Sequence, residues 1–219
     1  MRITVAIDGP AGAGKSTIAK LVANNLNLMY INTGSMYRAV TLIALENNIK
    51  PDDIISLQNL LDSIEMYFKN DRLILNNVDV NDQLTLPRIS NNVSNYAAIK
   101  EVREKLVKLQ QNMAAKFDVI MDGRDIGTVV LKDSKFKYFL SATPEERASR
   151  RFNELKSKGI DVIYNELLKE IKSRDYIDST RDLNPLTKAE DAVEIDSTNM
   201  TITEVVNFII DDIKNYDNI

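Results

Sequence analysis

The sequence predicts an α/β fold in which a doubly wound parallel sheet of five strands is flanked by helices. Three observations support this prediction. Short apolar runs alternate with longer segments of helical periodicity along most of the chain. A glycine-rich loop joins the first apolar run to the first helix. Between about 64 and 82 the apolar period changes to two. We therefore expect a single domain over residues 1–219 with one antiparallel insertion.

Two strands alternate with helices at the start of the chain. The apolar run 3–7 predicts a strand, and residues 15–26 predict a helix because their apolar side chains recur at helical spacing. Residues 28–31 predict a second strand. Asn32-Thr33-Gly34-Ser35 is typical of a helix start and predicts a helix to about residue 47. A further helix is expected to begin at 50–53.

The middle of the chain predicts an inserted subdomain. Apolar and polar residues alternate on both sides of Asn70-Asp71, which is the pattern of an antiparallel hairpin. The apolar members are Ile64, Met66, Phe68, Leu73 and Leu75. Helices are expected to follow at 87–97 and 100–115.

The α/β pattern then returns and continues through the second half of the chain. Apolar runs predict strands at 117–121, 136–140 and 192–195. Helical periodicity predicts the remaining helices at 144–158, 161–177 and 201–215. With the two earlier strands, these runs complete the expected five-stranded sheet.

The loop after the first strand contains a complete G-x-x-x-x-G-K-S/T phosphate-binding pattern, the P-loop. Its glycines let backbone N–H groups approach phosphate oxygens, and the following helix adds its positive end. Lys15 offers a charge to the β- and γ-phosphates of ATP, and the Ser16 hydroxyl can ligate Mg²⁺. A glycine-rich turn that matches by chance is the alternative, but the flanking strand and helix supply the required context. The predicted ATP-binding residues are Gly9, Pro10, Ala11, Gly12, Ala13, Gly14, Lys15, Ser16 and Thr17.

The composition excludes several kinds of chemistry. The chain of 219 residues has no Cys and no His, which excludes ordinary zinc sites, thiol nucleophiles, disulfides and histidine acid–base catalysis. Its net charge of −4 argues against bulk attraction to nucleic acid. No apolar run approaches the ~18 residues of a membrane span, and no charged-then-apolar leader precedes the first strand. We expect a cytoplasmic monomer without a nucleic-acid or membrane partner.

Further candidates follow the strand at 117–121. Asp122 ends this strand, as a carboxylate near bound Mg²⁺ often does, in direct contact or through water. An ordinary aspartate at a strand end is the alternative. Arg124 and Asp125 add a cation and an acceptor at the carboxyl edge of the sheet, where ligands of open α/β folds bind.

Arginines recur at helical spacing in two later segments. One set is Arg147, Arg150 and Arg151, and the other is Arg174, Asp178 and Arg181. A solvated helix face, or a ladder of weak ion pairs, is the alternative for each set. Together with Arg38, they supply more positive charge than one nucleoside triphosphate requires. A phosphate acceptor is already an anion and needs no catalytic base, so it fits this surplus better than an alcohol does.

Along essentially its whole length, the sequence resembles the bacterial cytidylate kinases. The matching segments are Ile7-Asp8-Gly9-Pro10, Thr33-Gly34-Ser35-Met36-Tyr37-Arg38, the run from Asp122 to Val130, Glu145-Glu146-Arg147 with Arg150-Arg151, and Arg174-Asp175 through Asp178 and Arg181. The resemblance implies transfer of the ATP γ-phosphoryl group to CMP or dCMP in the presence of Mg²⁺. We expect an in-line transfer without a covalent enzyme intermediate.

The resemblance also implies roles for individual positions. Arg38, Arg124 and Arg181 are expected to hold the acceptor phosphate, Ser94, Arg103 and Asp125 to read the cytosine edge, and Tyr37, Arg174 and Asp178 to lie around the sugar. Thr33 joins this substrate-binding set, and the expected catalytic residues are Lys15, Arg124, Arg147 and Arg151. Residues of about 34–100 correspond to the monophosphate-binding subdomain and 145–165 to a helical lid. Asn32 is a departure, since some relatives carry aspartate there.

Two other functions compete with this interpretation. A small-molecule kinase of the same fold, such as one resembling shikimate kinase or dephospho-coenzyme A kinase, would share the P-loop. A regulatory GTP-binding switch would need an N-K-x-D motif that reads guanine. The nearest sequence is Thr187-Lys188-Ala189-Glu190, which lacks both the Asn and the Asp.

Overall fold

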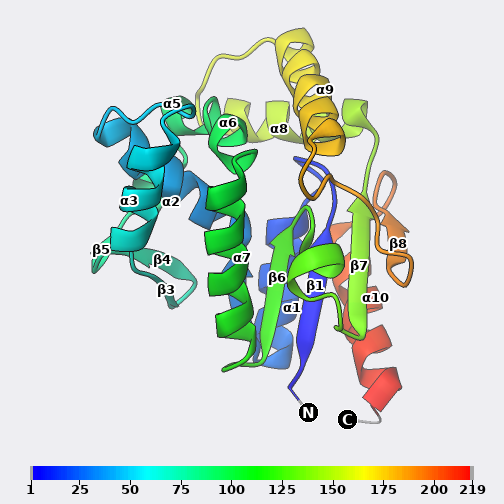
Figure 1. Ribbon diagram of the computed structural model, residues 1–219. Helices are drawn as coiled ribbons and strands as arrows, with labels where there is room; N and C mark the ends of the chain where they lie inside the picture. The colour runs from blue at the N-terminus through cyan, green and yellow to red at the C-terminus, as the bar shows by residue number, and fades with distance from the viewer. Residues whose placement is uncertain (1, 218–219) are drawn as a thin grey trace.

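Five parallel strands form the central sheet of the computed structural model, which describes residues 2–217 (Figure 1). Their order is β2-β6-β1-β7-β8. The strands are β1 (Thr4–Asp8), β2 (Met29–Asn32), β6 (Val119–Gly123), β7 (Phe136–Ser141) and β8 (Val193–Asp196). Parallel pairing on both sides of β1 sets Ile7 opposite Asp122 and Tyr138. The predicted five-stranded parallel sheet is confirmed.

Helices cover both faces of this sheet, and β1 contributes to both cores. On one face lie α1 (Lys15–Leu26) and α10 (Ile202–Asp217), and on the other α2 (Thr33–Glu46) and α7 (Lys100–Ala114). Because successive side chains of a strand point to opposite faces, Val5 and Ile7 join the core beneath α1 and α10, and Ala6 joins the other. Burial on both faces explains why the strands are nearly continuous apolar runs.

A separate antiparallel sheet lies beside α2 and confirms the predicted insertion (Figure 1). Its strands are β3 (Met66–Lys69), β4 (Arg72–Leu75) and β5 (Val78–Asp79). Asn70 and Asp71 both have positive φ, as do Asn76 and Asn77, which suits the tight turns between these strands. The third strand extends the hairpin that the sequence predicts.

Four helices accompany this small sheet, and one prediction about them is wrong. They are α3 (Ile54–Ser63), α4 (Asn81–Leu84), α5 (Pro87–Ser90) and α6 (Val93–Ala97). The single helix expected at 87–97 is interrupted at Asn91 and Asn92. The side-chain amide of Asn92 donates to the carbonyl oxygen of Arg88 at 2.9 Å. At the break, a side chain therefore takes an acceptor that would otherwise serve the backbone hydrogen bonds of a helix.

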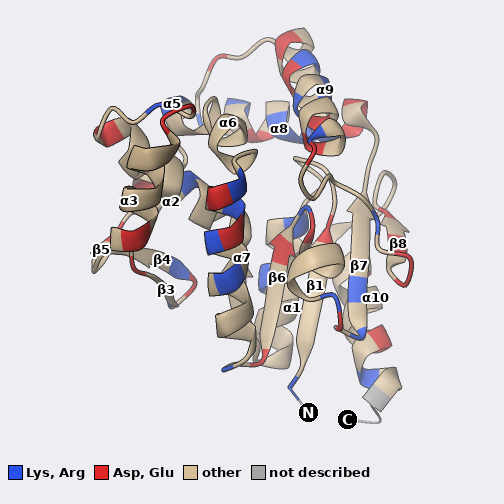
Figure 2. Cartoon of the chain, viewed as in Figure 1, with Lys and Arg blue, Asp and Glu red and all other residues tan. Residues whose placement is uncertain are grey.

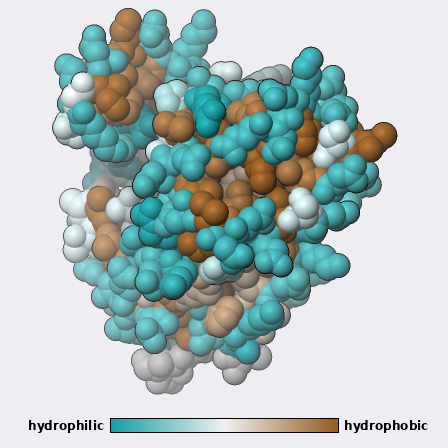
Figure 3. All heavy atoms as spheres, turned by 90° about the vertical axis from the view of Figure 1, so that its left-hand side faces the viewer, coloured by the Kyte–Doolittle hydropathy of each residue, from teal (hydrophilic) through white to brown (hydrophobic). Residues whose placement is uncertain are grey.

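The side of the molecule that carries the small sheet has a mixed surface. Figure 3 shows patches of hydrophobic residues set among hydrophilic ones on this side. The exposed large apolar side chains of α3, β3 and β5 are Ile55, Tyr67 and Val78. Ile55 and Tyr67 lie on the outer faces of α3 and β3, whose other apolar residues belong to the core or pack against it, and Val78 is exposed on β5.

Two long helices, α8 (Pro144–Ser157) and α9 (Tyr164–Thr180), pack against each other beyond the carboxyl edge of the central sheet (Figure 1). The Thr143 hydroxyl caps α8 by accepting from the backbone N–H of Glu146. The second helix begins and ends three residues later than the predicted 161–177. A π-helical turn, η1 (Ile126–Val130), follows β6 and was not predicted from the sequence. Within residues 2–217, no helix combines the length and apolar character needed to cross a membrane.

Candidate active site

The P-loop connects β1 to α1 and holds a buried lysine. At Gly9, φ is +145° and a Cβ atom would lie 2.0 Å from the carbonyl oxygen of Leu140, so only glycine fits. Lys15 is the first residue of α1, and its ammonium donates to the carbonyl oxygen of Pro10 at 2.7 Å. Burial lowers the pKa of Lys15 well below its usual value, and the charge of Arg124 lowers it further. An anion bound in the loop would offset both effects.

Asp122 lies at the end of β6 and faces the start of α1. Its Oδ2 atom accepts a hydrogen bond from the Ser16 hydroxyl at 2.7 Å, and its Oδ1 atom accepts one from the Tyr30 hydroxyl at 3.0 Å. Burial raises the pKa of Asp122, while Lys15 and the hydroxyl donors act in the opposite direction. Serine hydroxyl and carboxylate oxygens are hard ligands that suit Mg²⁺. Ser16 and Asp122 are far apart in the sequence, but in the structure they form one oxygen-rich site.

Three arginines gather next to this site with few partners of opposite charge. Arg124 donates to Asp178 at 2.7 Å, and Arg38 bonds only the carbonyl oxygen of Leu84 among residues 2–217. Burial, followed by the charge of Arg124, lowers the pKa of Arg174 to about 10 and also lowers that of Arg38. The Nε atom of Arg174 is buried and has no hydrogen-bond partner within the described chain. The cluster is suited to an anion.

A second charged group centres on Asp125, which is 5 % exposed. Arg103, from α7, pairs with one carboxylate oxygen of Asp125, and Arg181 approaches the other at 3.4 Å. The Arg103 guanidinium also lies 5.4 Å from the centre of the Tyr37 ring. Burial raises the pKa of Tyr37 to about 12, against the influence of Arg103. These four residues form a polar group, the Asp125 cluster, beside the arginine cluster.

The two helices above the sheet contribute a bidentate ion pair. Arg147, on α8, donates to both carboxylate oxygens of Asp175, on α9, at 3.0 and 2.6 Å. It also donates to the carbonyl oxygen of Ala11 in the P-loop at 2.8 Å. Figure 2 shows charged residues of both signs along α8 and α9. Arg147 thus connects α8, α9 and the P-loop.

The expected shared face of the α8 arginines is only partly present. Arg150 turns to the loop after β8, where it donates to the carbonyl oxygen of Ser197 at 2.6 Å. Arg151 is exposed and pairs with Glu154 at 2.9 Å on the same helix. Helical spacing predicts a common side of the helix but does not determine which partner each long side chain reaches.

Two further predicted residues occupy different surroundings. Thr33 is buried, and its hydroxyl donates to the backbone carbonyl oxygen of Asp122 at 2.6 Å, which links the start of α2 to β6. Ser94 is half-buried on α6, a helix that contacts α2 and α9. Thr33 therefore supports the position of Asp122, whereas Ser94 has no side-chain hydrogen bond among residues 2–217.

Three polar residues near the site, Asp8, Tyr30 and Asn32, were not predicted as site residues from the sequence. Asp8 is buried and accepts hydrogen bonds from the backbone N–H groups of Ile126 and Gly127 at 2.8 and 2.7 Å. Burial raises its pKa to about 6 despite these two donors. Its carboxylate fixes the π-helical turn that directly follows Asp125. The only sequence signal for Asp8 was its place in the segment before the P-loop.

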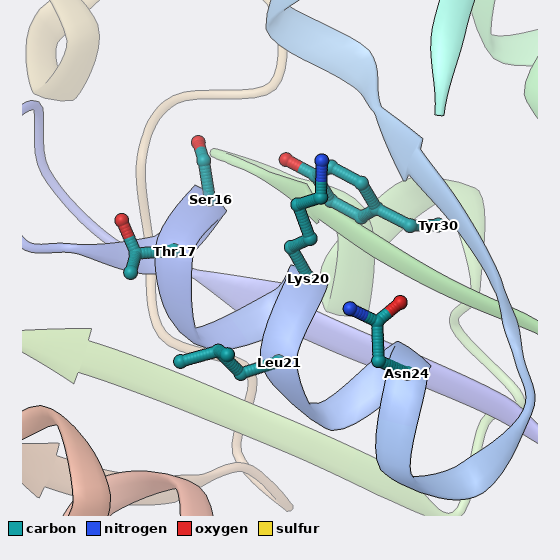
Figure 4. A pocket seen from close by; sticks show the side chains of 6 residues that line it. All are labelled: Ser16, Thr17, Lys20, Leu21, Asn24 and Tyr30. Atoms are coloured by element: carbon teal, nitrogen blue, oxygen red, sulfur yellow. The ribbon is translucent and has the colours of Figure 1, made fainter. Parts of the chain in front are cut away.

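A cavity of about 400 Å³ opens beside the P-loop helix. Figure 4 shows its lining, with Tyr30 from β2 facing residues of α1. The lining residues are Ser16, Thr17, Lys20, Leu21, Asn24 and Tyr30. Lys20 forms an ion pair of 3.4 Å with Asp71, at the turn between β3 and β4.

The chain matches a known protein family and is similar to several known proteins. The family model described as cytidylate kinase matches residues 5–215. The chain belongs to the cytidylate kinase family. It is 62 % identical over 210 residues to the cytidylate kinase of Clostridium acetobutylicum, covering 96 % of this chain and 97 % of that protein. It is 58 % identical over 214 residues to that of Clostridium botulinum strain Loch Maree, covering 98 % and 99 %. The resemblance inferred from the sequence is confirmed.

Solved structures support the fold of this cytidylate kinase family member. A shikimate kinase from Bacteroides thetaiotaomicron matches with a TM-score of 0.51 at 12 % identity, covering 99 % of both chains. An uncharacterized protein from Eubacterium ventriosum matches with a TM-score of 0.54 at 16 % identity, covering 98 % of this chain and 99 % of the other. At such identities the likeness concerns the fold alone.

Proposed function

We propose that this chain transfers the γ-phosphoryl group of ATP to CMP and dCMP, producing ADP and the cytidine diphosphate. The observation that carries the proposal is the pairing of two adjacent sites. The arginine cluster of Arg38, Arg124 and Arg174 lies beside the P-loop and can hold a second polyanion. Asp125 and its arginine partners lie next to that cluster. Membership of the cytidylate kinase family supports the same assignment.

The donor half of the reaction is assigned to the P-loop. Backbone N–H groups of Gly9 to Thr17 would surround the phosphates of ATP, and the Lys15 ammonium would neutralise charge on the transferred group. Ser16 and Asp122 fit Mg²⁺ by their oxygen donors and would hold it with the phosphates, Asp122 directly or through water. Bound Mg²⁺ would supply charge neutralisation between the β- and γ-phosphates.

The acceptor half is assigned to the Asp125 cluster. Cytosine presents an amino donor beside two acceptors, so a carboxylate with lone pairs to spare complements it. Arg103 already pairs with one oxygen of Asp125, and Arg103 and Ser94 are assigned as donors for the acceptor side of the base. Tyr37, Arg174 and Asp178 are assigned to the sugar, and Arg38, Arg124 and Arg181 to the phosphate. Thr33 supports this region through Asp122.

The chain's own residues accomplish the transfer by position and charge. The acceptor phosphate is an anion and attacks without a base, so the chief requirement is to offset repulsion between two polyanions. Arg124, Arg147 and Arg151 are assigned this task with Lys15. We assign residues 145–165 to a lid that closes over the nucleotides and excludes water, and 34–100 to the monophosphate-binding subdomain.

We also propose that the protein acts as a monomer in the cytoplasm. Every residue assigned to the two nucleotide sites comes from one chain, so the proposed reaction needs no second subunit. The reaction likewise requires neither nucleic acid nor a membrane, because both substrates are small water-soluble nucleotides.

A substrate panel tests the proposed function. ADP release is measured with ATP and Mg²⁺ in the presence of CMP, dCMP, UMP, AMP or shikimate. We expect rapid release with CMP and dCMP and much slower release with the other acceptors, because the Asp125 carboxylate favours an amino donor. The reaction without an acceptor is the control for simple ATP hydrolysis. Equal rates of ADP release with and without CMP would contradict transfer to the acceptor. Preferred phosphorylation of shikimate would replace the nucleotide assignment with a small-molecule kinase.

Replacing Asp125 by asparagine is expected to reduce the preference for CMP over UMP by about tenfold or more. The amide presents one donor group where the carboxylate offers only acceptors, and it removes the counter-charge of Arg103. The measurement is the ratio of kcat/KM for the two acceptors. Asp191→Asn is the matched control, since Asp191 is an exposed aspartate that pairs with Lys137 and has no assigned role. An unchanged ratio in Asp125→Asn would remove Asp125 from base recognition.

A further inference from the structure

A network of hydrogen bonds joins the carboxylate of Asp122 to three polar side chains. Ser16 donates to Oδ2 at 2.7 Å and Tyr30 donates to Oδ1 at 3.0 Å, so each carboxylate oxygen receives one hydroxyl proton. Asn32 donates from its amide nitrogen to the Tyr30 hydroxyl at 3.0 Å and, over 3.4 Å, to that of Ser16. Three segments meet in this network: the start of α1, the end of β2 and the end of β6.

The cap of α2 sets the direction of every proton in the network. The Oδ1 atom of Asn32 accepts from the backbone N–H of Ser35 at 2.9 Å, which fixes the amide nitrogen on the opposite side. That nitrogen can only donate, so the oxygens of Tyr30 and Ser16 must accept there. Each hydroxyl proton is then directed at Asp122. An aspartate at position 32 would only accept, and would compete with Asp122 for the Tyr30 proton.

Burial makes this arrangement costly to disturb. Tyr30 is 6 % exposed and Asp122 5 % exposed. The Tyr30 hydroxyl is the donor in its hydrogen bond to Asp122, because a carboxylate oxygen only accepts. Figure 4 shows Tyr30 on the cavity wall facing the P-loop helix that carries Ser16. Without the Tyr30 hydroxyl, Oδ1 of Asp122 would lose its side-chain donor, and Ser16 alone would orient the carboxylate through Oδ2.

We propose that Tyr30 is a positioning residue for the metal site of the proposed kinase reaction. It acts through Asp122 and, with Asn32, keeps one lone pair of the Ser16 hydroxyl directed outward to a divalent cation. The proposal rests on the proposed function only in naming Mg²⁺ with ATP as the ligand. Residues behind metal ligands typically change metal affinity by about 10- to 100-fold when replaced.

Tyr30→Phe tests the proposal because it removes only the hydroxyl group. We expect the free Mg²⁺ concentration for half-maximal CMP phosphorylation to rise by about tenfold, with little change in the KM for CMP. Calorimetric titration with ATP, with and without Mg²⁺, gives a second readout that does not depend on turnover. Here the gain in ATP affinity produced by Mg²⁺ is expected to shrink, while binding of metal-free ATP stays unchanged.

Tyr138→Phe is the matched control. Its hydroxyl also donates to an aspartate, Asp212 at 2.7 Å, but on the side of the sheet near α10. We expect a change in melting temperature without any change in Mg²⁺ dependence. Identical Mg²⁺ dependence in wild type and Tyr30→Phe, by both readouts, would overturn the proposal. Absence of CMP phosphorylation in the wild type would overturn the proposed function instead, and calorimetry would still decide the role of Tyr30.

Discussion

Lys15→Met is expected to lower kcat for CMP phosphorylation by about 10²–10³-fold or more while the fold remains intact. Methionine keeps much of the length and apolar character of the lysine stem but cannot neutralise a phosphoryl group. In the structure the ammonium is buried and, among residues 2–217, bonds only the carbonyl oxygen of Pro10. Because burial already lowers its pKa, the lysine has more to gain from a bound polyanion than an exposed lysine would.

The measurement combines a coupled ADP-release assay with thermal unfolding. Lys137→Met is the matched control, since Lys137 is equally buried and pairs with Asp191 and the carbonyl oxygen of Lys132. This control is expected to lose stability and retain turnover. Near-normal kcat in folded Lys15→Met would contradict the assignment of the P-loop to the donor nucleotide.

Arg124→Ala is expected to reduce kcat/KM for CMP by about 10³-fold, with a much smaller change in the KM for ATP. The guanidinium lies in the arginine cluster, where burial lowers the pKa values of Lys15, Arg38 and Arg174 and the charge of Arg124 lowers them further. Its removal would leave the acceptor phosphate with less counter-charge at the moment when two polyanions approach. Asp178 would also lose its partner at 2.7 Å.

Arg124→Lys separates these two effects, because it keeps the charge near Asp178 but lacks the planar pair of donors. An intermediate kcat/KM is expected. Arg72→Ala is the control for a lost ion pair, since Arg72 bonds Asp79 and Asp82 at the exposed start of β4. Full activity of Arg124→Ala would show that the acceptor phosphate binds elsewhere.

The fold could be predicted because its signals are local in sequence. The P-loop composition, the buried apolar strands and the change of period near residue 64 each depend on a few neighbouring residues. The errors have equally local causes, as at Asn92, where one side-chain hydrogen bond interrupts a predicted helix. The turn at 126–130 was missed because its geometry depends on Asp8, which is distant in sequence.

The candidate site was only partly predictable. Helical spacing predicts that Arg147 and Arg151 lie on one side of a helix. It does not indicate that Arg147 bonds Asp175 and the carbonyl oxygen of Ala11. In the sequence, Tyr30 is part of a short apolar run that predicts a strand. Its hydroxyl reaches Asp122 because β2 pairs with β6, and that pairing is not visible in the sequence. A role that depends on the direction of hydrogen bonds between residues distant in sequence can be recognised only in the three-dimensional structure.

One consequence follows from the adjacency of Arg174 and Asp175 on α9. Asp175 bonds Arg147 and through it the P-loop, whereas Arg174 belongs to the cluster assigned to the acceptor. A rigid helix cannot move one of these side chains without displacing the other. Occupancy of the donor site and of the acceptor site would therefore be thermodynamically linked, and each nucleotide would alter the affinity for the other by the same factor.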